Sequence, residues 1–170
     1  MKILVVSDSH GRDDDVKGVM EQVKDFDMLI HCGDVEGGED YIRALTEKPV
    51  IMVAGNNDFR SDLPAKEIVE IEDYKILVTH GHQFYVNFGV GNLEDYCRQN
   101  NIQVAMFGHT HKPYLQIEED LTILNPGSIS YPRQSDRKQT FLIMEIDKDG
   151  EAHYSHGIYK GTTKKGWLGW

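Results

Sequence analysis

The chain has 170 residues, the size of one ordinary domain, and can bury a core without disulfides or a structural metal. Its 28 acidic and 18 basic residues give a formal charge of −10, which argues against stable binding to nucleic acid or an anionic membrane. Cys32 and Cys97 form no CxxC pair and are interpreted as free thiols in a reducing compartment. The first residues do not resemble a secretory leader, and no apolar run approaches about 20 residues. A single cytoplasmic domain over residues 1–170 is expected.

Strand-like and helix-like segments alternate in the first third of the chain. The apolar runs over 2–8, 28–34 and 49–56 are typical of strands covered on both faces. Between them, 13–26 and 38–47 carry apolar residues at helical spacing, and three aspartates at the start of the first segment suit a helix dipole. The alternation predicts a βαβαβ unit with parallel strands.

The pattern changes after residue 64. Segment 65–82 reads as two strands joined by a tight turn near Asp73 and Tyr74, followed by a short helix over 92–101 and a buried strand over 102–111. Strand-like pieces cover 113–120, 121–128, 139–150 and 151–159, and mostly antiparallel pairing is expected there. The prediction is one α/β domain with two packed sheets flanked by helices.

Five apolar runs end in side chains of the types that ligate metals. Ligands of open α/β sheets gather beyond the carboxyl ends of the strands, so these side chains are expected at one edge. Each has a plainer interpretation by itself, because Asp caps helices, Asn suits turns and a lone His is usually a satisfied, packed side chain. The joint pattern favours a metal site. The five strand ends are Asp8-Ser9-His10, Gly33-Asp34, Gly55-Asn56-Asn57-Asp58, His80-Gly81-His82 and Gly108-His109-Thr110-His111.

The ligand types indicate the chemistry. Carboxylate, amide oxygen and imidazole without thiolate suit Mn²⁺, Fe or Zn²⁺. Seven candidates are too many for one ion with an open position, but two ions sharing a carboxylate would use them all. Two such ions with two aspartates and a bridging hydroxide keep about one positive charge, which attracts an anion. Ions about 3.5–4 Å apart would activate that hydroxide for in-line attack on phosphorus, so phosphoester hydrolysis is predicted.

These motifs resemble the signature of the calcineurin-like metallophosphoesterases. The motifs are Asp8-x-His10, Gly33-Asp34, Gly55-Asn56-x-Asp58, His80 and Gly108-His109-x-His111. Their order and spacing are similar to those of the small bacterial and archaeal phosphodiesterases sometimes called YfcE-like, from Lys2 to at least Arg133. The resemblance implies a four-layer α/β/β/α sandwich with two mixed sheets, and a small phosphodiester or phosphate ester as substrate.

The resemblance also implies a role for each ligand. Asp34 would bridge two divalent ions, of which Mn²⁺ is preferred and Ni²⁺, Fe²⁺ and Zn²⁺ are alternatives. The spacing of His80 and His82 lets either face the ions, and the resemblance favours His80. His31 lies inside a strand and is interpreted as packed. The remaining ligands would be Asp8, His10 and His111 for the first ion, and Asn56, His80 and His109 for the second.

Asn57 departs from the family pattern. Many members have a histidine there, paired with the following acid, which is Asp58 in this chain, to protonate the leaving alkoxide. A neutral amide cannot act as that acid. The proton would have to come from water or from His82, so activated esters or diesters are expected rather than simple alkyl monoesters. Asp58 and His82 are the catalytic candidates.

Two further segments have open interpretations. Residues 125–133, "NPGSISYPR", form either a Pro-Gly turn or a phosphate contact through Ser128 or Arg133, and Arg133 is the substrate-binding candidate. The tail beyond residue 160 could contact nucleic acid through Trp and Lys side chains, but a frayed end or subunit contact fits the acidic chain better. A homodimer is the expected assembly.

Two other functions compete with the phosphodiesterase. The fold is similar to the metallophosphoesterase-like subunit of the retromer coat, a scaffold whose metal site is degraded. All seven ligand positions here carry competent residues, which favours the enzyme. A zinc hydrolase of the metallo-β-lactamase type would need an HxHxDH run, and the chain has none.

Overall fold

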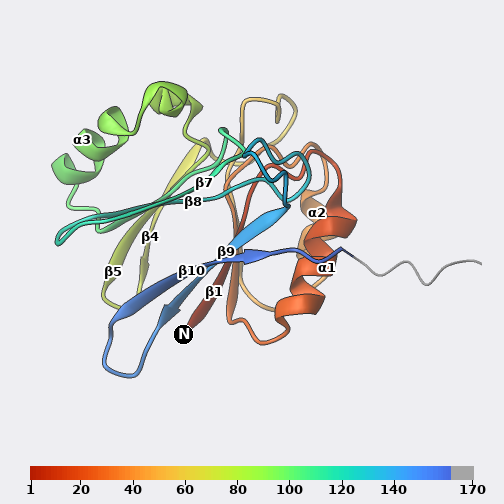
Figure 1. The fold of residues 1–170 in the computed structure, drawn as a ribbon, viewed down its shortest axis with the longest axis horizontal. Coiled ribbons are helices and arrows are strands. Elements are labelled where there is room, and N and C mark those ends of the chain that lie inside the picture. Colours follow the sequence, from red (N-terminus) through yellow and green to blue (C-terminus); the bar gives the residue numbers. More distant parts are fainter. Residues whose placement is uncertain (162–170) are drawn as a thin grey trace, which may run out of the picture.

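A computed structural model describes residues 1–161 of the protein as two facing five-stranded sheets with helices outside them (Figure 1). The Trp and Lys side chains of the tail considered above, which are Lys164, Lys165, Trp167 and Trp170, lie outside the described residues. Within residues 1–161, no helix combines the length and apolar character needed to cross a bilayer.

The first sheet has the strand order β10-β9-β1-β2-β3. Strands β1 (Lys2–Val6), β2 (Met28–His31) and β3 (Val50–Met52) are parallel, and helices α1 (Asp13–Val23) and α2 (Glu39–Ala44) connect them. This is the predicted βαβαβ unit. The antiparallel strands β9 (Thr140–Ile146) and β10 (Ala152–Ile158) complete the sheet on the other side of β1.

The second sheet has the order β4-β5-β6-β8-β7. Its centre is parallel, with β5 (Tyr74–Thr79), β6 (Val104–Met106) and β8 (Thr122–Pro126), and its edges β4 (Lys66–Ile71) and β7 (Pro113–Ile117) are antiparallel. Helix α3 (Gly91–Gln99) leads into β6. Two short 3₁₀-helices that the pattern did not predict, η1 (His82–Phe84) and η2 (Val86–Phe88), precede α3.

Alternation along the strands separates three apolar layers. In β1, Ile3 and Val5 belong to the core between the sheets, whereas Leu4 packs with residues of α1 and α2. In β5, Ile76 lies in the same central core, whereas Leu77 packs with residues of α3. Because successive side chains of a strand point to opposite faces, each sheet is covered by the other sheet on one face and by helices on the other. The four-layer α/β/β/α sandwich expected from the sequence is confirmed.

The carboxyl ends of the parallel strands in both sheets face one region. Backbone hydrogen bonds join the loops there: Asp8 N–H donates to the Gly33 carbonyl at 3.0 Å, and Gly108 N–H to the His80 carbonyl at 3.1 Å. The loop after β1 is therefore fixed to the loop after β2, and the loop after β5 to the loop after β6, by backbone contacts alone.

Candidate metal centre

Four of the seven predicted ligands form one compact group. The ligand atoms of Asp8, His10, Asp34 and His111 all lie within 4.8 Å of one another. His111 Nε2 is 3.2 Å from Asp8 Oδ1 and 3.1 Å from His10 Nε2, and His10 Nε2 is 3.7 Å from Asp34 Oδ2. The loops after β1, β2 and β6 thus bring together the set expected for a first ion with its bridging aspartate.

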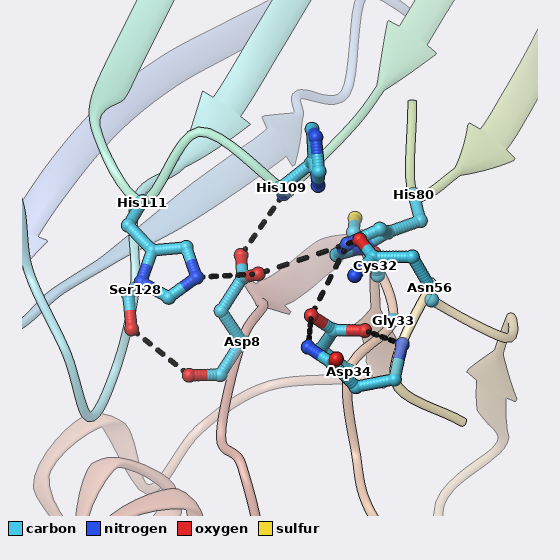
Figure 2. Close-up of polar contacts among 12 residues, drawn as sticks. Asp8, Cys32, Gly33, Asp34, Asn56, His80, His109, His111 and Ser128 are labelled. Carbon is cyan, nitrogen blue, oxygen red and sulfur yellow. Dashed lines mark hydrogen bonds and ion pairs between the residues drawn. The ribbon is translucent and has the colours of Figure 1, made fainter. Parts of the chain in front are cut away.

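A second group meets the first at Asp34 (Figure 2). His80 Nε2 lies 3.4 Å from Asp34 Oδ2 and 3.1 Å from Asn56 Oδ1. The His109 ring centroid is 5.1 Å from that of His80, and its Nε2 lies 2.7 Å from Asn87 Nδ2. Asp34, His80 and Asn56 are therefore in contact, and His109 borders them.

Three imidazoles present the same nitrogen to these groups. His80 Nδ1 lies 2.8 Å from the Cys32 carbonyl, His111 Nδ1 lies 2.7 Å from the Tyr131 carbonyl, and His10 Nδ1 lies 2.7 Å from Glu36 Oε1. A carbonyl or carboxylate oxygen can only accept, so each Nδ1 carries the proton it donates. In the neutral ring Nε2 is then an unprotonated lone pair directed at the aspartates.

This arrangement brings acceptors together without donors between them. Nε2 lone pairs of His111 and His80 face oxygen atoms of Asp8, Asp34 and Asn56. Asp8 Oδ1 is fully buried and accepts no hydrogen bond from any residue between 1 and 161. Burying such an acceptor is costly unless a proton or a cation lies beside it. The donor set therefore fits a divalent-ion site.

The backbone at the candidate ligands is strained. Asp8, His10, Asp34, His109 and His111 all have positive φ, between 48° and 67°, a region that non-glycine residues adopt at a cost of about 1–3 kcal/mol. Such strain persists only where surrounding contacts impose it, and it gathers at functional sites. Five of the seven predicted ligands carry it.

Two glycines let the loops of the centre approach one another closely. A Cβ at Gly33 would lie 2.7 Å from His80 Nδ1, and one at Gly108 would lie 2.9 Å from Asp8 Oδ2. Gly33 also has φ of 97°, which disfavours other residues. A side chain at either position would displace the histidine or the carboxylate that it contacts.

The buried charges stabilise one another. Burial alone would raise the pKa of the Asp8 carboxyl, but the contacts with His111 and His80 outweigh it and hold the pKa below its usual value. Burial opposes the same shift at Asp34, but its contacts with His80 and Asn57 outweigh burial and hold its pKa below the usual value. The pKa of His80 is correspondingly raised against burial, mainly by Asp34. Both carboxylates are ionised at neutral pH, as ion ligands must be.

Asn57 and Asp58 hold the loops of the centre. Asn57 donates to Asp34 twice, from its backbone N–H to Oδ1 at 2.8 Å and from its amide Nδ2 to Oδ2 at 2.7 Å. The buried Asp58 carboxylate accepts backbone N–H groups from Val35, Glu36 and Gly55 at 2.7–3.2 Å. Asp58 therefore joins the loops after β2 and β3, and Asn57 fixes the carboxylate expected to bridge.

The predicted proton donor and the phosphate contacts lie around this centre. The His82 ring centroid is 5.5 Å from that of His80, and its Nδ1 is buried without a hydrogen-bond partner among residues 1–161. Burial, with His80 adding to it, lowers the pKa of His82. Ser128 Oγ is buried and donates to the Asp8 carbonyl at 2.9 Å, which matches the turn interpretation of that segment. The Arg133 side chain is exposed, and its backbone N–H donates to the His111 carbonyl.

Sequence reasoning missed two side chains that orient histidines. Glu36 contacts His10 Nδ1, and Asn87 contacts His109 Nε2. Glu36 follows the Gly33-Asp34 motif by two residues, so its proximity to Asp34 was a usable signal. Asn87 lies in η2, which was not predicted, and nothing in its surroundings marked it.

Comparison with known proteins identifies the family. The model of the calcineurin-like phosphoesterase superfamily domain matches residues 1–149. The chain belongs to this superfamily. It is 38% identical to the probable metallophosphoesterase MJ0623 of Methanocaldococcus jannaschii over 138 residues, 78% of this chain and 70% of that protein. It is 31% identical to the probable metallophosphoesterase YsnB of Bacillus subtilis over 150 residues, 88% of this chain and 86% of that one. The resemblance drawn from the motifs is confirmed.

Solved structures share the fold. A conserved Streptococcus pneumoniae protein, named a predicted phosphoesterase, superposes with a TM-score of 0.77 at 30% identity, covering 92% of this chain and 97% of its own. The Escherichia coli phosphoesterase YfcE has a TM-score of 0.64 at 22% identity, with 94% and 100% covered. Vps29 of Entamoeba histolytica complexed with Zn²⁺ has a TM-score of 0.71 at 24% identity, with 94% and 99% covered. The last two show the fold alone.

Proposed function

We propose that the chain is a dinuclear metal-dependent phosphodiesterase acting on small phosphodiesters. One observation carries the proposal: three histidines, each held through Nδ1, direct Nε2 toward two buried aspartates. A phosphodiesterase of the same superfamily, MJ0936 of Methanocaldococcus jannaschii, is 28% identical over 150 residues, which adds support. The whole chain, residues 1–170, is proposed to form this one domain.

The seven proposed ligands would form two ion sites that share one carboxylate. Two divalent ions, with Mn²⁺ preferred, would supply Lewis acidity that activates water and neutralises charge on the phosphoryl group. Asp8, His10 and His111 would hold one ion, and Asn56, His80 and His109 the other. Asp34 contacts both groups, through His10 and His80, and would bridge them. Asn57, by its two hydrogen bonds, keeps that carboxylate in position.

The leaving group decides which esters are cut. The Asn57 amide donates its hydrogen bond to Asp34, and the Asp58 carboxylate accepts backbone N–H groups. Neither side chain would therefore deliver a proton to an alkoxide. His82 lies beside the His80 group and is the proton donor we propose, with water as the alternative. We therefore propose that diesters and activated esters are hydrolysed in preference to alkyl monoesters, and that Asp58 acts as a positioning residue.

The test uses the metal-stripped chain. Mn²⁺, Ni²⁺, Fe²⁺, Zn²⁺ and Mg²⁺ are added back one at a time, and hydrolysis of bis(p-nitrophenyl) phosphate is compared with that of p-nitrophenyl phosphate. The expected result is Mn²⁺-dependent turnover with the diester preferred. Turnover of neither ester with any of the ions would contradict the proposal and favour the alternative, a scaffold of the Vps29 type that recruits protein partners. A cytoplasmic location and a homodimer also remain proposals.

A further inference from the structure

A hollow of about 650 Å³ opens beside the candidate metal centre. We call it the arginine hollow. Its volume is that of a site for a small organic ligand. The residues that matter for its chemistry are His10, Glu36, His111, Tyr131, Arg133 and Arg137.

The arginine hollow is continuous with the centre. His10 and His111, two of the proposed ligands of the first ion, form part of its wall. The Arg133 backbone N–H donates to the His111 carbonyl at 2.9 Å, and His111 Nδ1 lies 2.7 Å from the Tyr131 carbonyl. A molecule whose phosphodiester lies at the centre can therefore extend one ester arm directly into the hollow.

The charges of the hollow are unbalanced. Within residues 1–161, no carboxylate oxygen lies within 4.0 Å of Arg133 or Arg137, whereas Arg12 and Arg98 both have such partners. The acid nearest in sequence, Asp136, pairs with Lys138 at 3.6 Å. Glu36, the carboxylate in the wall, is occupied by His10 Nδ1. Two unpaired guanidinium groups in a chain of charge −10 thus face one hollow.

The segment that carries these arginines is a fixed turn. The Arg137 backbone N–H donates to the Gln134 carbonyl at 3.1 Å, and its Nη1 donates to the Pro132 carbonyl at 3.1 Å. One guanidinium nitrogen is thereby held, and the others remain available. Guanidinium groups bind phosphate through two parallel hydrogen bonds, so the pair suits a tetrahedral dianion better than a single carboxylate.

The Tyr131 ring lines the arginine hollow next to His10. The Tyr131 ring is 52% exposed and meets the His10 ring edge-on, with centroids 5.5 Å apart. Aromatic rings favour contact with another ring or a sugar. We infer that the arginine hollow binds a second phosphate of the substrate, so that the substrates are phosphodiesters whose one arm carries a ring and a further phosphate group. This inference rests on the proposed phosphodiesterase function and names its substrate class.

The test compares two substrates that differ by one phosphate. Thymidine 5′-(p-nitrophenyl phosphate) and its 3′-phosphorylated form are hydrolysed by the Mn²⁺-loaded chain, and release of p-nitrophenol gives kcat/KM. The expected preference for the 3′-phosphorylated form is about tenfold or more, as one or two charge-assisted hydrogen bonds would give. In Arg137→Ala the preference falls toward one. Arg43→Ala, an equal loss of charge at an exposed position of α2, keeps it.

Each other outcome has a distinct meaning. A wild-type preference near one, or a preference that Arg137→Ala retains, overturns the inference while leaving the phosphodiesterase intact. An analogue with a 3′-O-carboxymethyl group that gains as much as the phosphate would overturn the assignment to phosphate. Failure to cut even bis(p-nitrophenyl) phosphate removes the proposed function itself. Circular dichroism of each variant establishes that the fold is retained.

Discussion

The candidate metal centre and the arginine hollow share a wall but are built in opposite ways. In the centre, Asp8, Asp34, His80 and His111 are buried, and each histidine is held through Nδ1. In the hollow, Arg133 and Arg137 are exposed, and only their backbone and one guanidinium nitrogen are held. Buried, constrained side chains suit chemistry that needs fixed geometry. Exposed side chains on a surface turn suit selection among substrates, which loop changes can alter without harm to the fold.

Asp34→Asn should have the largest effect, because Asp34 is the proposed bridge and its Oδ2 lies 3.7 Å from His10 Nε2 and 3.4 Å from His80 Nε2. The loss in kcat/KM for bis(p-nitrophenyl) phosphate is expected to reach about a thousandfold or more, since charge stabilisation by the ions would fall with it. Bound Mn²⁺ per chain should fall in parallel. Asp95→Asn, the same change at an exposed position of α3, is the control. Full activity in Asp34→Asn would show that the rigid centre is not the catalytic one.

His31, at the end of β2, tests how rigid the buried residues beneath the metal centre are. It is fully buried, and burial lowers its pKa from 6.5 to about 4. Gly33 N–H donates to its Nδ1, so the neutral ring donates from Nε2 to Ser9 Oγ. The unfolded chain takes up this proton at higher pH than the folded one. Stability is therefore fully present above pH 6.5 and is lost as pH falls from 6.5 toward 4.

Between pH 6.5 and pH 4 the protonation of His31 should lower the free energy of unfolding by about 3 kcal/mol. Urea unfolding of the metal-free chain at several pH values measures it, and the slope of wild type minus that of His31→Gln isolates the histidine from Asp8, Asp34 and His80. If the free energy of unfolding has the same pH dependence in both proteins, the His31 ring is hydrated in the folded state and the loops around it are not rigid.

His82→Ala is expected to separate good from poor leaving groups. His82 is the one proposed proton donor beside the His80 group, so a diester that releases an alkoxide should lose about a hundredfold in kcat. A diester that releases p-nitrophenolate needs no proton and should lose little. Equal losses on both substrates, or none on either, would remove His82 as the acid and leave water in that role.

Glu36 tests whether the fixed geometry extends beyond the ligands. Glu36→Ala should weaken Mn²⁺ binding at the first site about tenfold, because His10 loses the acceptor that orients it. Glu36→Gln keeps an acceptor without the charge, so its affinity for Mn²⁺ should lie between those of wild type and Glu36→Ala. Calorimetric titration of Mn²⁺ gives the affinity directly, with Glu47→Gln as the exposed control. Unaltered binding in Glu36→Ala would make the contact incidental.

The smallest effect is expected in the hollow. Tyr131→Ala should raise KM for thymidine-bearing diesters by about three- to tenfold, the value of one aromatic contact, with kcat little changed. The Tyr131 carbonyl that meets His111 remains in the variant. Tyr131→Phe keeps the ring and should keep KM. A larger fall in kcat than rise in KM would mean that the ring supports the centre rather than the substrate.

The sequence predicted the centre better than its surroundings. Strand ends that finish in Asp8, Asp34, His80 and His109 are local signals, and parallel strands bring their ends together, so the gathering of ligands followed from the pattern. The contact of Glu36 with His10 depends on loop conformations with positive φ at both residues, which no spacing rule gives. The arginine hollow depends on how segment 131–138 lies against the loops after β1 and β6, which is set by tertiary contacts.

Contacts with segments remote in sequence add details that the pattern does not give. The carboxylate of Asp58, a catalytic candidate from the sequence, accepts three backbone N–H groups, as buried Asp residues in loops often do. The mostly antiparallel pairing expected of the last third is confirmed in β7–β8 and β9–β10, and β8 also pairs in parallel with β6.

The most direct test of the central claim is calorimetric titration of the metal-free chain with Mn²⁺, with bis(p-nitrophenyl) phosphate turnover measured at each addition. Two proposed sites sharing Asp34 predict a stoichiometry of two ions per chain, with turnover rising mainly as the second ion binds. Turnover that is complete at one ion per chain, or the absence of turnover with two ions bound, would contradict it.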